Sequence, residues 1–236
     1  MNFIFDLHIH TIYSDGKATP NDVIEIAKKK NIGVAITDHN EIRGSIKGFE
    51  LSKDVNYILG IEVGTKDGKE VLFYFDDIDE IESFYKKEIE PYKTNRMTRI
   101  ERNIDEFLNK NYKFLFTTIP HPFGPLKKNI YHNVELSNKI LDFVDCIEIF
   151  NYTQSKKSNQ QALLLAKKMQ KPMIASSDAH LIEDIGKGLT YLEIENNMIN
   201  TKIIKTSEFD IANTIKTLFY IGISNFKYSI LKERNV

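Results

Sequence analysis

Hydrophobic and polar positions along the chain follow two alternating patterns. Short runs rich in β-branched and aromatic residues, bounded by turn formers, predict strands. The predicted strands are Phe3–His10, Val34–Thr37, Tyr57–Val63, Val71–Phe75, Phe114–Ile119, Cys146–Phe150, Met173–Ala175 and Leu189–Ile194. Helical spacing of apolar residues predicts helices at Asn21–Lys30, Ser158–Gln170 and Ile211–Leu231. Strands that alternate with helices favour parallel βαβ units, and hence a barrel or an open doubly wound sheet.

The stretch from Ile81 to Lys110 reads as a long, charged, helix-rich insert that Pro91 splits. The second half of this insert has Met97, Ile100 and Ile104 at helical spacing. The length of 236 residues fits one domain, and no low-complexity linker divides the chain. We therefore expect a single domain over residues 1–236 with a helical insert at about 80–112. The last predicted helix fits either closure of that domain or an oligomer contact.

Composition limits the partners and the chemistry. The 32 basic and 33 acidic side chains leave a net charge of -1, which gives no overall electrostatic reason to bind nucleic acid or an anionic membrane. The single cysteine, Cys146, excludes an internal disulfide framework and any cysteine-rich metal site. The N-terminal sequence has no basic leader, and no apolar run reaches the ~20 residues of a membrane span. We expect a cytoplasmic protein whose metals, if bound, use histidine and carboxylate.

Histidines and carboxylates gather at the ends of the predicted strands. His8 and His10 are two apart on the first strand, so their side chains share one face. The carboxyl ends of strands are where active-site residues gather in α/β folds and barrels. The histidines in such positions are His8, His10, His39, His121 and His180, and the carboxylates are Asp15, Asp38, Glu62 and Asp178. The sixth histidine, His132, lies in a polar context typical of the surface.

These side chains are ligands for divalent metals. Neutral imidazole binds zinc, manganese or iron, and a carboxylate can bridge two ions. Because the ligands come from many separated strands, the pattern favours a catalytic cluster over a structural zinc site. Asp6 and Asp38 are placed to orient imidazole rings from behind.

Five motifs resemble those of a known superfamily. In order, DLHIHTIYSDG, TDHN, GIEV, HPFG and SSDAH are similar to the motifs of the polymerase and histidinol phosphatase (PHP) superfamily, and together they extend over most of the chain. The resemblance implies an α/β fold: a distorted (β/α)7 barrel with a metal site at the C-terminal ends of the strands and a helical cap insert over the metals. The usual chemistry of the superfamily is phosphoester hydrolysis.

The resemblance also implies two to three divalent ions of zinc, manganese or iron. By motif, His8, His10, Glu62 and Asp178 hold the first ion. Glu62 bridges to a second ion that His121 binds, and Asp15, His39 and His180 hold a third. Many members have a histidine in the strand after the GIE motif, whereas the matching stretch here, Glu70–Phe75, has none. The second metal position is therefore either empty or completed by another residue.

Further residues resemble substrate-binding groups of the superfamily. Arg96, Arg99 and Arg102 recur every three residues, as on the arginine-bearing helix that caps the cleft in small phosphoesterases. Residues three apart on a helix are neighbours, so Arg96 and Arg99 can grip one phosphate together. Asn151, with Glu148 at a strand end, resembles polar groups that face the cleft. A solvated charged face and an ordinary strand-end turn are the alternative interpretations.

The resulting hypothesis is metal-dependent hydrolysis of a small phosphomonoester or nucleotide. A hydroxide held between two metals attacks phosphorus, and the third metal and the arginines orient the phosphate. His180 or a metal-bound water is the candidate leaving-group acid. The alternatives are an exonuclease or phosphodiesterase acting on oligonucleotides, a catalytically degenerate metal-binding accessory module, and an amidohydrolase. We expect the binding partner to be a small phosphorylated substrate. Binding to nucleic acid is possible but not favoured, and we expect no binding to a membrane.

Overall fold

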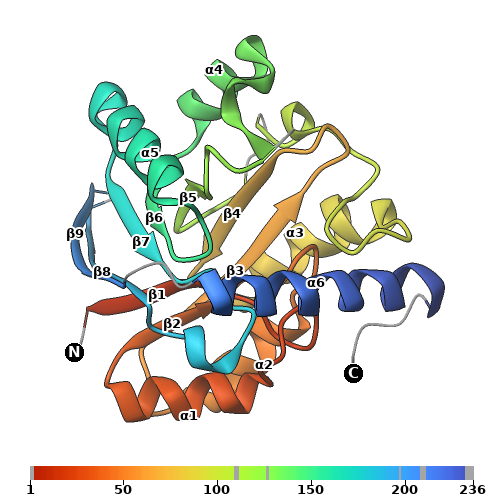
Figure 1. Ribbon diagram of the computed structural model, residues 1–236, viewed down its shortest axis with the longest axis vertical. Coiled ribbons are helices and arrows are strands. Elements are labelled where there is room, and N and C mark those ends of the chain that lie inside the picture. The colour runs from red at the N-terminus through yellow and green to blue at the C-terminus, as the bar shows by residue number, and fades with distance from the viewer. Residues whose placement is uncertain (1–2, 109–111, 126–127, 197, 208–210, 232–236) are drawn as a thin grey trace.

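The structure is a computed structural model that describes residues 3–108, 112–125, 128–196, 198–207 and 211–231. Nine strands form one sheet in the order β7-β6-β5-β4-β3-β2-β1-β8-β9 (Figure 1). The strands are β1 (Ile4–Ile9), β2 (Gly33–Ile36), β3 (Tyr57–Gly64), β4 (Glu70–Phe75), β5 (Phe116–Ile119), β6 (Cys146–Asn151), β7 (Met173–Ser176), β8 (Gly188–Glu195) and β9 (Met198–Thr206). The eight strands predicted from the sequence are all present.

The sheet curls until its two sides nearly meet. Beyond the end of β7, Ala179 pairs with Ile9 of β1 in a parallel bridge. The backbone N–H of His10 donates to the carbonyl oxygen of Ala179 over 2.9 Å. This contact closes seven strands, β1 to β7, into a barrel-like ring, while β8 and β9 extend the sheet beside β1. The expected barrel-like α/β fold is confirmed.

The expectation of uniformly parallel strands is wrong at β4. This strand runs antiparallel to both β3 and β5. A tight turn explains the direction: the N–H of Thr65 donates to the carbonyl oxygen of Lys69 over 2.9 Å. Antiparallel strands can be joined by so short a turn, whereas a parallel crossover needs a dozen or more residues. β8 is likewise antiparallel to β1.

Six α-helices surround the sheet among the described residues. They are α1 (Pro20–Lys30), α2 (Arg43–Leu51), α3 (Ile78–Phe84), α4 (Val134–Phe143), α5 (Lys156–Met169) and α6 (Ile211–Leu231). In the part of the chain described here, no helix has the length and apolar character needed to cross a membrane. Helix α1 begins one residue before the predicted start at Asn21, because Thr19 is its N-cap and forms a reciprocal capping box with Asp22 around Pro20.

The insert is less helical than the sequence suggested. After α3 come a π-helical turn, η1 (Tyr85–Ile89), and a 3-10 turn, η2 (Glu90–Tyr92). Lys93 then pairs with Ile100 in an antiparallel bridge, and the only regular turn up to residue 108 is the short η3 (Ile104–Glu106). Two further 3-10 turns are η5 (Ile130–His132) and η6 (Ile182–Asp184). Residues 109–111 of the predicted helix lie outside the described residues.

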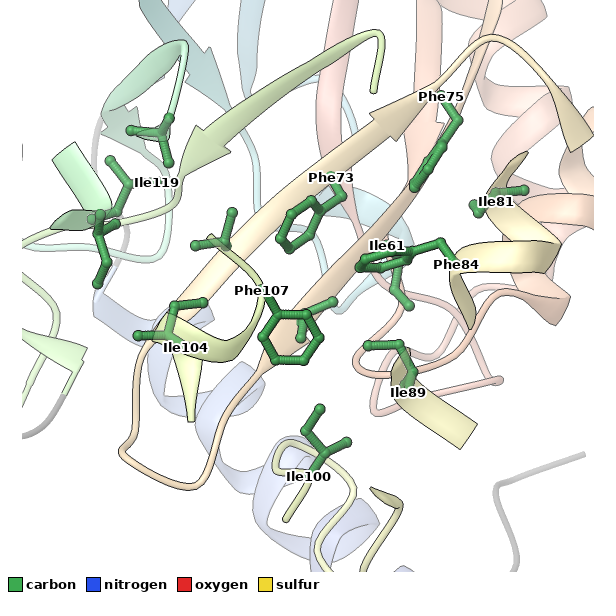
Figure 2. Packing of buried hydrophobic residues seen from close by; sticks show 14 of the residues in the cluster. Ile61, Phe73, Phe75, Ile81, Phe84, Ile89, Ile100, Ile104, Phe107 and Ile119 are labelled. Atoms are coloured by element: carbon green, nitrogen blue, oxygen red, sulfur yellow. The ribbon is translucent and has the colours of Figure 1, made fainter. Parts of the chain in front are cut away.

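Apolar residues of the insert pack against the outer face of β3 and β4. Ile100, Ile104 and Phe107 are buried there, although the segment that bears them is mostly not helical. In Figure 2 Phe107 lies between Phe73 and Ile100, and the ring centroid of Phe73 is 6.5 Å from that of Phe107 and 5.0 Å from that of Phe84. The apolar spacing in this segment therefore predicted correctly which residues are buried, but its prediction of a helix was wrong.

We expect Phe73→Ala to destabilise the protein by about 3–5 kcal/mol, because Phe73 is fully buried among aromatic rings and its removal leaves a cavity. Urea unfolding followed by circular dichroism would measure this change. Phe49→Ala is the control: Phe49 is 41% exposed on α2, so the expected loss is below about 1 kcal/mol. Equal losses for the two variants would contradict this view of the core.

Candidate metal centre

The end of β1 brings two imidazoles together inside the ring. His8 and His10 are both buried, and their Nε2 atoms are 3.1 Å apart. Oδ1 of Asp178 lies 3.5 Å from Nε2 of His8 and 3.2 Å from Nε2 of His10. Asp178 follows β7, so the closure of the ring is what brings its carboxylate to β1.

Glu62 occupies the middle of the centre. Imidazole nitrogens of His8, His10, His39 and His121 lie 3.6, 3.5, 2.8 and 3.3 Å from its carboxylate oxygens. Both oxygens of Glu62 are buried, and none of these contacts has hydrogen-bond geometry. A buried carboxylate without hydrogen bonds is costly. Cations held between the carboxylate and the imidazoles would remove that cost.

Asp15 forms the other end of the centre. Its Oδ1 lies 3.3 Å from Nε2 of His180 and 3.8 Å from Nδ1 of His10, and its Oδ2 lies 3.7 Å from Nε2 of His39. Asp38 positions this loop, because its carboxylate accepts hydrogen bonds from the backbone and hydroxyl of Thr11 and from the hydroxyl of Ser14. Asp38 thus holds the loop that carries Asp15.

All eight side chains predicted as ligands lie in this one cluster. Its donor atoms form overlapping groups whose members lie within 4.8 Å of one another. The groups are His10–Asp15–His39–His180, His8–Glu62–His121, His8–His10–Asp178 and His39–Glu62–Glu70. Ligand atoms about 2.1 Å from a tetrahedral ion lie about 3.4 Å apart, which matches the separations found here. The donor set therefore fits divalent metal ions.

Electrostatics shift the pKa values of the clustered side chains in opposite directions. Burial opposes protonation of His180, but the carboxylates of Asp15 and Asp178 outweigh it and raise its pKa to about 9. Burial would raise the pKa of Asp15, yet His39 and His180 hold that pKa well below its usual range. Desolvation, together with neighbouring His180 and His39, lowers the pKa of His10 to about 4.

Glu148 on β6 supports the centre from behind. One of its oxygens lies 3.1 Å from Nδ1 of His8, and the other accepts a hydrogen bond from the backbone N–H of His121 over 2.6 Å. Glu148 therefore has the imidazole-orienting position that the sequence suggested for Asp6. Asp6 instead accepts hydrogen bonds from Ser177 and the N–H of Gly186, and burial raises its pKa to about 6.

Asn151 was predicted to bind substrate, but it is fully buried and contacts the carboxylates of the centre. Its amide group donates to Glu148 over 2.9 Å and to Asp178 over 3.1 Å. Its side chain therefore holds two carboxylates in place and lies beneath the surface that a substrate would reach.

Arg96, Arg99 and Arg102 do not share one helix face, because the segment that bears them is not helical. Arg102 pairs with Glu88 and Glu106 and lies apart from the centre. Arg99 reaches the centre, because its Nη1 donates to Oε1 of Glu70 over 2.6 Å. Arg96 and Arg99 line the same cavity, which has a volume of about 840 Å³. The remaining lining residues are Lys66, Gly68, Thr94, Asn95, Ile100, Glu101, Pro125, Lys128 and His132.

Two residues at the centre were missed as functional candidates from the sequence. Glu70 is buried beside His121, with 3.6 Å between Oε2 and Nε2, and Lys128 lies 2.9 Å from the same oxygen. Lys128 has no motif around it, so no signal pointed to it. Glu70 had one: it directly precedes the predicted apolar strand Val71–Phe75, and a buried carboxylate there needs a partner.

Backbone strain accompanies two of the candidate ligands. Asp178 has a φ of 51° and His121 a φ of 27°, values that residues other than glycine rarely adopt. Such conformations cost on the order of 1–3 kcal/mol each and cluster at functional sites. Both residues follow the ends of strands, so the strained backbone aims their side chains into the ring.

The chain is similar in sequence to a known family and to an archaeal protein. A family model described as PHP-associated matches residues 156–216. An uncharacterized protein of Methanocaldococcus jannaschii is 32% identical over 162 residues, which are 62% of this chain and 80% of that protein.

Solved structures share the fold. A candidate metal-dependent phosphoesterase from Bifidobacterium adolescentis has a TM-score of 0.56 and 16% identity, covering 92% of this chain and 96% of that one. The lesion-specific endonuclease PfuEndoQ from Pyrococcus furiosus has a TM-score of 0.62 and 21% identity, covering 83% of this chain and 53% of that one. At these identities the likeness concerns the fold.

We expect the apparent affinity for a divalent metal to rise with pH between 6 and about 9. Below its pKa of about 9, His180 carries a proton that a metal must displace, so lower pH weakens binding by up to about tenfold per pH unit for one proton. Titration calorimetry with Mn²⁺ in buffers of different ionisation enthalpy would measure both the affinity and the protons released. His132→Gln, at an exposed position, is the control and should leave the pH slope unchanged. An affinity independent of pH would refute this expectation.

Proposed function

Since the chain belongs to the polymerase and histidinol phosphatase (PHP) superfamily, we propose that it is a metal-dependent phosphoesterase acting on a small phosphomonoester or a nucleotide. One observation carries the proposal: eight buried imidazoles and carboxylates from separate strands converge with the spacing of ligands around cations. A structural zinc site needs four ligands, so a centre of this size is better suited to catalysis.

The proposed assignment follows the resemblance to the superfamily. The donor-atom groups His8–His10–Asp178 and His8–Glu62–His121 agree with it in part. The first ion would be held by His8, His10, Glu62 and Asp178, and the second by His121 with Glu62 as a bridge. The third would be held by Asp15, His39 and His180. When bound, zinc, manganese or iron ions would activate a water molecule and neutralise charge that develops on the phosphoryl oxygens.

The chain's own residues prepare the centre for this chemistry. Glu148 lies beside Nδ1 of His8, which favours the tautomer that leaves Nε2 unprotonated and able to bind a metal. Both ring nitrogens of His180 are engaged, Nδ1 with the carbonyl oxygen of Asp178 and Nε2 with Asp15. This geometry supports a ligand role for His180 over that of the leaving-group acid.

The cavity beside the centre is the proposed place for the rest of the substrate. Arg99 and Lys128 line it and both contact Glu70 at the edge of the centre. Arg96 adds a third positive charge to the lining. Guanidinium groups bind phosphate oxygens in pairs of parallel hydrogen bonds, so this wall suits an anionic substrate.

A phosphodiesterase that acts on oligonucleotides is the second candidate. The positive charges of Arg96, Arg99 and Lys128 in the lining would accommodate more than one phosphate, while Lys66, which also lines the cavity, pairs with Glu101. The fold shared with PfuEndoQ is compatible with this activity. A steep decline of oligonucleotide binding with rising salt would favour this candidate, since each phosphate contact steepens the salt dependence.

Activity on a panel of phosphomonoesters, nucleotides and short oligonucleotides, measured with zinc, manganese or iron restored, tests the proposal. We expect Asp178→Asn to lower the rate more than about 100-fold and to lower the bound metal, because a direct ligand should matter more than the 10- to 100-fold typical of groups behind the ligands. Asp54→Asn is the control, since Asp54 is exposed and remote from the cluster. A folded, metal-loaded protein with no turnover would overturn the proposal and favour an accessory module.

A further inference from the structure

Glu70 is the one buried carboxylate of the cluster that the proposed ligand assignment does not use. Its Oε2 lies 3.6 Å from Nε2 of His121, and Oε1 of Glu62 lies 3.3 Å from the same nitrogen. One oxygen of Glu70 is also within 4.8 Å of donor atoms of His39 and Glu62. In the β3–β4 register Gly64 faces Glu70 and Leu72 faces Glu62, so the two glutamates are diagonal neighbours on one face.

The surroundings of Glu70 fix its carboxylate with one oxygen aimed at the cluster. Oε1 accepts the hydrogen bond from Arg99, and Oε2 lies between Nε2 of His121 and Nζ of Lys128, which is 2.9 Å from it. Burial would raise the pKa of Glu70, but Lys128 and Arg99 outweigh it and lower that pKa to about 2. Gly64 is needed for this arrangement, because a Cβ there would lie 2.6 Å from Nη1 of Arg99 and 2.1 Å from the carbonyl oxygen of Thr98.

We propose that Glu70 is a ligand of the second metal ion, together with Glu62 and His121, and that Arg99 and Lys128 hold its carboxylate in place. Its contact with His121 matches the spacing expected of two ligands on one ion. Glu70 would then complete the position for which the strand Glu70–Phe75 supplies no histidine. The proposal rests on the metal centre of the proposed function but not on the substrate.

Metal stoichiometry and affinity test this role without reference to turnover. We expect Glu70→Gln to lose one ion of the wild-type complement, or to bind one ion at least about 10-fold more weakly, with the other ions retained. Elemental analysis and Mn²⁺ titration of the whole chain measure both. Glu88→Gln is the matched control, because Glu88 is also buried and paired with an arginine but lies outside the cluster.

A second variant separates a ligand from a mere counter-charge. Glu70→His replaces the carboxylate by another metal ligand without its negative charge, so we expect it to restore the ion that Glu70→Gln loses. Full metal content in Glu70→Gln would overturn the proposal. So would a folded Glu70→His that binds as little metal as Glu70→Gln. If wild type binds its metals but hydrolyses no phosphoester, the proposed function fails while the role of Glu70 stands.

An independent observation concerns α6, which crosses the front of the barrel in Figure 1. Its buried residues include polar ones: Thr217 and Ser224 are almost fully covered, and Nδ2 of Asn225 lies 3.4 Å from Oδ2 of Asp15. Its outward face is apolar. The large side chains exposed there, each by 38 to 71%, are Ile215, Leu218, Phe219, Ile223, Phe226 and Ile230. A helix normally turns such a face inward.

Four of these residues, Ile215, Phe219, Phe226 and Ile230, are spaced symmetrically about Gly222 and Ile223, whereas the position that matches Leu218 is the exposed Lys227. In an antiparallel pair of two copies of α6, Ile215 would face Ile230 of the partner subunit, and Phe219 would face Phe226 of the partner subunit. Gly222 has open space around its Cα, so it permits close approach of a second helix. A twofold axis requires this kind of self-complementary surface.

The area is sufficient for a dimer. Six exposed side chains of these sizes would cover roughly 700 Å² per protomer, close to the ~800 Å² per partner of a standard stable interface. We infer that the outward face of α6 binds the same face of a second copy of this chain in antiparallel orientation.

Sedimentation analysis and cysteine cross-linking test this dimer. We expect twice the chain mass of 27.4 kDa for wild type. Phe219→Glu should give a monomer, and Leu164→Glu, at an exposed position on α5, should remain a dimer. A monomeric wild type, including one that binds lipid vesicles through α6, would overturn the inference.

Orientation is tested by single cysteines, since the native Cys146 is buried and should not cross-link. Ile223→Cys lies next to the proposed axis and should form an intermolecular disulfide on oxidation. Ile230→Cys is the control: in an antiparallel pair the two copies of this position are about 22 Å apart, at 1.5 Å per residue, and should not cross-link. Equal cross-linking of both variants would indicate parallel helices and refute the antiparallel pairing.

Discussion

Charge compensation around Glu62 is the constraint on which the rest of the structure depends. The carboxylate is completely buried, and four imidazoles surround it within 3.6 Å. Because burial in a low dielectric penalises charge, the protein must supply compensating groups from every side. Burial would raise the pKa of Glu62, but His39 and His8 lower it well below its usual range. The barrel provides the one place where strands far apart in sequence can deliver these groups.

The ring of strands explains why the supporting groups are buried as deeply as the ligands. Glu148, Asn151 and Ser176 form hydrogen bonds with one another or with the ligands at the ends of β6 and β7. These groups fix ring orientation and tautomer in advance of metal binding.

Much of the site could be predicted from the sequence, because its ligands follow short, well-marked strands. The shared face of His8 and His10 follows from the alternation of side chains along a strand. Asp178 and His180 could be placed because they follow the end of another predicted strand. The direction of β4 was missed, although the seven residues between the predicted strands Tyr57–Val63 and Val71–Phe75 are too few for a parallel crossover. The contact between Arg99 and Glu70 joins residues 29 positions apart through an irregular segment, so no local spacing indicated it. Helical periodicity predicted α6 but not that its apolar face would point outward.

The pairing of β1 has a consequence for how the chain folds. One edge of β1 pairs with β2, which follows soon in the sequence, but the other edge pairs with β8, where Ile4 lies opposite Tyr191. His8 and His10 are synthesised long before Asp178 and the residues of β8, so their surroundings cannot close until those later residues have emerged from the ribosome. Contacts this distant in sequence slow folding, and an unpaired strand edge is prone to aggregation in the meantime. The nascent chain therefore carries an unpaired β1 edge until β8 has been made.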